Sequence, residues 1–129
     1  MIHHLSIPAE NPHRVAEVLA ELWGGVAYPF PPHPGSYIAM AGDKDGTAIE
    51  VYPLGTELVP GDGEKPVQFG RGTSSQFSAI HVNLSASTSL ETVQQIGARE
   101  GWRVLLCNRG PFEVIEFWLE NRLMIEVLT

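Results

Sequence analysis

Two stretches of the chain resemble each other, Ile2-His3-His4-Leu5-Ser6-Ile7 and Ala79-Ile80-His81-Val82-Asn83-Leu84. In each, a histidine precedes an apolar, a small polar and a second apolar residue. The tripeptide Ile-Glu-Val follows each histidine at nearly the same spacing, at 49–51 and at 125–127. Matches at both ends of two halves of similar length indicate an internal duplication.

Helix signals fall at the same place in both halves. Asn11-Pro12 provides a cap and a first-turn proline, and apolar residues then recur with helical spacing up to Gly24. In the second half, Thr88-Ser89-Leu90-Glu91 is a capping box, and the helix that it opens ends at Gly101. Each half therefore contains one amphipathic helix after its first strand.

Alternating apolar residues and turn residues predict four strands in each half. They are expected at 2–8, 26–30, 36–41 and 47–54, and again at 77–84, 102–107, 113–119 and 122–128. This order predicts an α+β fold of two tandem βαβββ modules, 1–54 and 77–129, within a single domain over 1–129. Residues 55–76, rich in Gly, Pro, Ser and Thr, are expected to form a linker between the modules.

Four polar side chains share a face in this prediction. Side chains alternate across a strand, so the polar residues lie opposite the aliphatic ones that pack on the helices. Any one of them could simply face solvent. Because they recur in matched positions, we interpret them as candidate ligands of a divalent metal ion such as Ni, Zn, Fe or Mn. The four residues are His4, Glu50, His81 and Glu126.

The sequence resembles the vicinal oxygen chelate superfamily, which includes glyoxalase I, bleomycin-resistance proteins and extradiol dioxygenases. The resemblance covers residues 2–128. It implies that the two modules pair into a cupped mixed sheet with helices on its outer face, and that His and Glu from each module hold a metal in the cup. The motifs that carry it are His4-Leu5-Ser6-Ile7, Asp43-Lys44-Asp45-Gly46-Thr47-Ala48-Ile49-Glu50-Val51, His81-Val82-Asn83-Leu84 and Leu123-Met124-Ile125-Glu126-Val127.

Two functions are consistent with this resemblance. The first is a glyoxalase-like metal-dependent enzyme with isomerase or lyase chemistry on a small substrate that chelates through carbonyl or hydroxy oxygens. Either Glu126 or Glu50 would act as its general base, and the sequence does not choose between them. The second is a metal-free protein of the bleomycin-resistance type, whose cup, lined by Tyr52, Met124 and Leu128, would sequester a small molecule.

Composition and net charge limit the kinds of partner that the protein is expected to bind. Eight Lys and Arg against fifteen Asp and Glu give a net charge of −7, with no basic run for nucleic acid or an anionic membrane. The single cysteine, Cys107, excludes an internal disulfide.

No signal peptide or membrane span is recognised, so we expect a soluble cytoplasmic protein. Edge strands of short modules favour a homodimer. The resemblance allows the modules to pair either within one chain or across the dimer, and the sequence does not choose between these arrangements. Scattered arginines such as Arg103 and Arg109 could pair with an anionic substrate, but they are expected to be surface charges.

Overall fold

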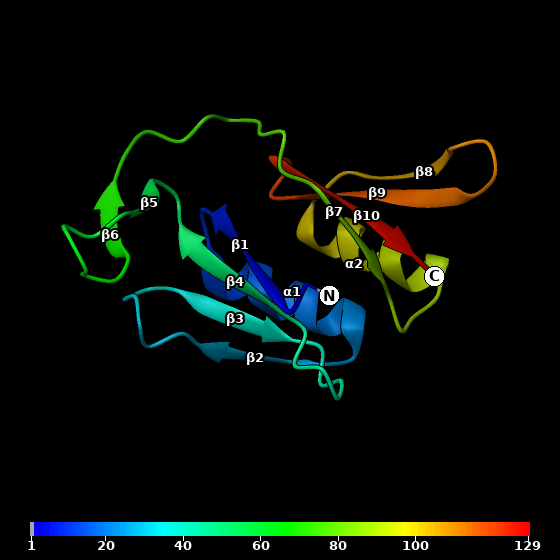
Figure 1. The fold of residues 1–129 in the computed structure, drawn as a ribbon. Coiled ribbons are helices and arrows are strands. Elements are labelled where there is room, and N and C mark those ends of the chain that lie inside the picture. Colours follow the sequence, from blue (N-terminus) through cyan, green and yellow to red (C-terminus); the bar gives the residue numbers. More distant parts are fainter. Residues whose placement is uncertain (1) are drawn as a thin grey trace.

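The computed structural model, which describes residues 2–129, contains two four-stranded mixed sheets and two helices in a repeated order (Figure 1). The order β1-β4-β3-β2 in the first sheet and β7-β10-β9-β8 in the second confirms the predicted α+β fold of two βαβββ modules. The first module comprises β1 (His4–Ala9), α1 (Pro12–Trp23), β2 (Val26–Pro29), β3 (Tyr37–Met40) and β4 (Ala48–Pro53). The second comprises β7 (Val82–Ser85), α2 (Leu90–Glu100), β8 (Val104–Asn108), β9 (Glu113–Leu119) and β10 (Leu123–Leu128).

The strand register repeats the duplication at the level of single residues. In the first sheet β1 runs parallel to β4 and places Ser6 opposite Glu50. In the second sheet β7 runs parallel to β10 and places Asn83 opposite Glu126. Each of these small polar residues lies two positions after the matched histidine, so the two glutamates occupy equivalent places in the two modules.

Both helices begin and end close to where their capping residues predict, although Ser89 rather than Thr88 caps the second helix. The side chain of Asn11 accepts a hydrogen bond from the backbone N–H of Arg14, and that of Ser89 accepts one from Thr92. Gly24 and Gly101 close the helices in the left-handed conformation, with φ of 68° and 70°. The helices therefore have defined ends that hold the strands after them in place.

One continuous core joins the two modules. It consists of the apolar stripes of the helices and the aliphatic faces of the strands, and its fully buried members include Leu19, Leu22, Ile49, Phe117 and Ile125. Burial of each such side chain contributes about 1.5–3 kcal/mol. Because burial of these side chains is favourable, the aliphatic face of each strand turns inward. The polar residues of β1, β4 and β10 consequently lie on the opposite face.

Two segments differ from the sequence prediction. The expected linker contains a hairpin, β5 (Thr56–Val59) and β6 (Gln68–Arg71), that pairs on itself. The strand expected over 77–84 begins only at Val82, because β10 offers partners to β7 only from Val82 to Ser85. Within residues 2–129 no helix is long and apolar enough to cross a membrane.

Candidate metal centre

The first module brings two of the four predicted ligands together. His4 begins β1 and Glu50 lies in the neighbouring strand β4, with His4 Nε2 and Glu50 Oε1 3.7 Å apart. Metal–nitrogen and metal–oxygen bonds of first-row ions are about 2.1 Å, so two ligands of one ion lie at most about 4.2 Å apart. The pair therefore fits one ion. We call His4 and Glu50 the N-terminal half-site.

Neutral hydroxyl groups orient Glu50. Ser6 Oγ donates to its Oε2 at 2.9 Å, and Tyr52 Oη donates to the same oxygen at 3.0 Å. Both bonds end on Oε2, which leaves Oε1 facing His4. Burial, and then the hydrogen bond to Glu50, raise the pKa of Tyr52 to about 12, so this phenol remains a donor at neutral pH.

The second module places Glu126 in a different environment. Arg109, which follows β8, donates to Glu126 Oε1 from Nη2 at 3.0 Å and from Nε at 3.2 Å. Asn83 Nδ2 donates to Oε2 at 3.3 Å. His81 is exposed and lies one residue before β7 begins. We call His81 and Glu126 the C-terminal half-site.

A second carboxylate shares the guanidinium of Arg109. Glu116 of β9 lies opposite Glu126 of β10 and accepts from Arg109 Nη2 at 2.8 Å. The hydrogen bond from Arg109 is the main cause that lowers the pKa of Glu116 below its ordinary value. Trp118 Nε1 donates to the other oxygen of Glu116 at 3.4 Å. Arg109 therefore forms ion pairs with two carboxylates of the chain, where the sequence predicted a surface charge.

The four predicted ligands fall into two pairs, one in each module. Within residues 2–129, no three His, Cys, Asp or Glu side chains gather closely enough to hold one ion. Imidazole and carboxylate donors are present in each half-site, and the chemistry of the set suits a divalent first-row ion. His4 Nε2 and Glu50 Oε1 lie within the distance that one ion can bridge, whereas Glu126 already forms an ion pair with Arg109.

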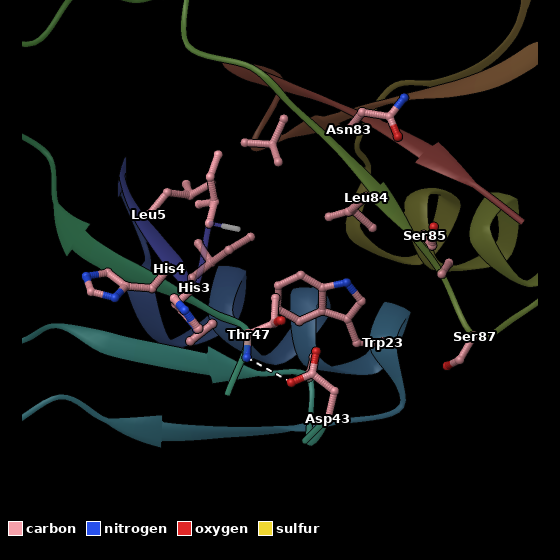
Figure 2. A pocket seen from close by; sticks show the side chains of 16 residues that line it. His3, His4, Leu5, Trp23, Asp43, Thr47, Asn83, Leu84, Ser85 and Ser87 are labelled. Atoms are coloured by element: carbon pink, nitrogen blue, oxygen red, sulfur yellow. Dashed lines mark hydrogen bonds between the residues drawn. The ribbon is translucent and has the colours of Figure 1, made fainter. Parts of the chain in front are cut away.

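A cavity of about 590 Å³ opens between the two modules (Figure 2). The edge strands β1 and β7 line it, and Trp23 and Leu84 contribute to its mostly apolar wall. His4 is at its border, whereas Glu50 and Glu126 are not among its lining residues. The cavity therefore marks the seam between the sheets, where neither edge strand has a partner strand within residues 2–129.

Aromatic residues that the sequence did not connect gather beside Glu50. The ring of His33, from the loop between β2 and β3, lies 5.4 Å from that of Tyr52 and 4.6 Å from that of Phe69 in β6. Phe69 lies in the segment interpreted as a linker, so no periodic signal indicated this contact. Arg109 was missed for a related reason, since a side chain in a turn has no strand alternation that fixes its direction.

Comparison with known proteins gives structural matches alone. No family model and no curated protein matches the sequence. A possible glyoxalase from Bacillus cereus superposes with a TM-score of 0.59 at 17% identity, over 100% of this chain and 98% of that one. Lactoylglutathione lyase from Agrobacterium tumefaciens gives 0.62 at 12%, over 98% and 91%. The fosfomycin resistance protein FosX from Mesorhizobium loti gives 0.60 at 12%, over 98% and 88%. These matches confirm the predicted fold over the whole chain.

Proposed function

We propose, from the vicinal oxygen chelate fold that this chain adopts, that the protein is a metal-dependent enzyme acting on a small oxygen-chelating substrate by isomerase or lyase chemistry. The observation that carries the proposal is the pair His4 Nε2 and Glu50 Oε1, 3.7 Å apart on the polar face of β1 and β4. The matched place of Glu126 beside Asn83 in the second module supports a second pair of ligands.

His4, Glu50, His81 and Glu126 would hold the divalent ion, either Ni, Zn, Fe or Mn. The ion would polarise a carbonyl or hydroxy oxygen of the substrate. Glu50 is the better-placed general base, because its Oε1 accepts no hydrogen bond from Ser6 or Tyr52 and faces the site. Oε1 of Glu126 already accepts two bonds from Arg109. Ser6 and Tyr52 would hold Glu50 through Oε2, while Oε1 leaves the metal and takes a proton.

A second copy of the chain would complete the site. β1 and β7 are both edge strands that border the cavity, and the two half-sites belong to different modules. Pairing between copies would cover these edges and bring the N-terminal half-site of one copy to the C-terminal half-site of the other. Mixing and refolding His4→Ala/Glu50→Ala with His81→Ala/Glu126→Ala should then restore metal binding in mixed dimers. If verified mixed dimers do not regain metal binding, the proposal that each site combines half-sites from two copies would be contradicted.

Thermal unfolding tests whether the protein binds metal. A metal present at 100 times its dissociation constant stabilises the folded state by about 2.7 kcal/mol. We expect Ni²⁺ or Zn²⁺ to raise Tm by several degrees in the wild type and not in His4→Ala. His13→Ala is the control, because His13 is an exposed histidine on α1. Equal metal-induced shifts in all three proteins, or no shift in any of them, would contradict the proposed site.

A metal-free binding protein is the second candidate. The cluster of His33, Tyr52 and Phe69 favours it, because these rings offer apolar surface to a small molecule beside Glu50. Binding of an aromatic ligand that persists in the presence of a chelator, combined with no metal-induced shift in Tm, would favour this function over the first.

A further inference from the structure

We propose that Arg109 is a built-in counter-cation that competes with the metal ion for Glu126, so that loading of the C-terminal half-site requires displacement of its guanidinium. The inference rests on the proposed metal site and adds to it a control of metal affinity. It assigns a role to a side chain that lies outside the four predicted ligands.

The contacts of Glu126 show how completely Arg109 engages it. Oε1 accepts from both Nη2 and Nε of Arg109, at 3.0 and 3.2 Å, and Oε2 accepts from Asn83 Nδ2 at 3.3 Å. The side chain of Glu126 is only 14% exposed. A metal ion that binds Oε1 must therefore replace two charge-assisted hydrogen bonds in a partly desolvated setting. It would also meet the positive charge of the guanidinium at close range.

The duplicated register provides an internal comparison. Glu50 occupies the matched position in the first module, but its partners Ser6 and Tyr52 are neutral and leave Oε1 free. The two half-sites therefore differ in charge, although Glu50 and Glu126 hold equivalent register positions. The difference follows from a single side chain, Arg109, that reaches across β9 and β10 from the end of β8.

Glu116 can hold the guanidinium of Arg109 after the ion pair between Arg109 and Glu126 opens. Nη2 lies 2.8 Å from Glu116 Oε1, closer than to Glu126, so one of the two ion pairs can persist when the other opens. The side chain of Arg109 is 37% exposed, which leaves room for the guanidinium to turn toward solvent. Gly110, with φ of 94°, follows Arg109 and begins the turn to β9. The movement required is thus a side-chain rotation.

The test is the affinity for Ni²⁺ alone, measured by isothermal titration of the purified protein. We expect Arg109→Gln to bind Ni²⁺ about tenfold more tightly than the wild type, since a hydrogen bond to a charged group is worth at least about a factor of ten. Arg103→Gln is the matched control. It removes the same charge from the same module, and its guanidinium makes no ion pair within residues 2–129. Its affinity should stay within about twofold of the wild type.

Glu116→Gln is a second variant with an effect of opposite sign. Without Glu116, release of Glu126 leaves the guanidinium with no carboxylate partner, so Ni²⁺ should bind more weakly. Unchanged or weaker affinity in Arg109→Gln, or an equal gain in Arg103→Gln, would overturn the role of Arg109 while leaving the metal site intact. Failure of the wild type and of every variant to bind Ni²⁺ would overturn the metal site together with this inference.

Discussion

Glu50 and Glu126 hold matched positions in two copies of one strand pair, but they accept hydrogen bonds from groups of different charge. Ser6 and Tyr52 orient Glu50 without neutralising it, whereas Arg109 forms an ion pair with Glu126. The duplication thus repeats the backbone and the carboxylate, and the neighbouring side chains give each carboxylate its own chemistry.

The bond between Tyr52 and Glu50 leads to a pH-dependent prediction. The pKa of Tyr52 lies near 12, above the ordinary value of 10.0, because of burial and of the Glu50 carboxylate. Its contribution to stability is therefore complete below pH 10 and is lost as the pH rises toward 12. We expect ultraviolet titration to show one tyrosine with a pKa of about 12 that disappears in Tyr52→Phe.

Glu50→Gln should move this tyrosine to a lower pKa, because the variant removes the negative charge and retains the burial. Ser6→Ala is the control that leaves the carboxylate in place. Ionisation of every tyrosine near pH 10 in the wild type would contradict the contact between Tyr52 and Glu50.

At the scale of elements, α2 packs against β8 so closely that Gly97 leaves no room for a side chain. A Cβ atom at this position would lie 2.1 Å from Val104 Cγ2 and 3.2 Å from the carbonyl oxygen of Trp102. The branched side chain of Val104 is fixed by its strand and cannot move away freely. The spacing between α2 and the second sheet thus depends on this glycine.

Gly97→Ala should therefore destabilise the protein by about 1 kcal/mol, although alanine is the better helix former. Equilibrium denaturation in urea measures this change. In a Val104→Ala background, Gly97→Ala should destabilise the protein less than it does in the wild type, because the truncated side chain leaves space for the new methyl group. A net gain in stability for the single variant would contradict the close packing of α2 on β8.

At the scale of the whole molecule, ion pairs between the helices join the two modules. Arg14 of α1 contacts Glu100 at the end of α2, with Nε 2.8 Å from Oε2. Arg99 of α2 donates to Glu21 of α1 at 2.7 Å. The hydrogen bond from Arg14, followed by that from Arg99, holds the pKa of Glu100 at about 2. These ion pairs lie where the two helices meet.

Glu100→Gln should lower the free energy of unfolding by about 1 kcal/mol at neutral pH. A depressed carboxyl pKa contributes stability above its ordinary value of 4.5 that is lost as the pH falls through about 2. The difference between wild type and variant should therefore disappear near pH 2. Glu17→Gln is the control, because Glu17 also pairs with Arg14 but within the same helix. A difference that persists unchanged at pH 2 would contradict the ion pair.

The fold followed from the sequence because the helix caps, strand alternation and repeated Ile-Glu-Val all agree. The same alternation predicted the common face of His4 and Glu50. It could not predict that His81 precedes β7, because the length of that strand depends on its pairing with β10. The reach of Arg109 and the contact of Phe69 depend on tertiary packing of a turn and a hairpin, for which composition indicates only a loop.

The most direct test of the metal site is elemental analysis of the untagged protein by plasma mass spectrometry, beside a His4→Ala/Glu126→Ala variant. A tag is avoided because its histidines would bind metal. We expect about one equivalent of Ni, Zn, Fe or Mn per chain in the wild type, and its loss in the variant. Absence of metal from the wild type after reconstitution with each ion, or equal metal content in the variant, would contradict a site built from these residues.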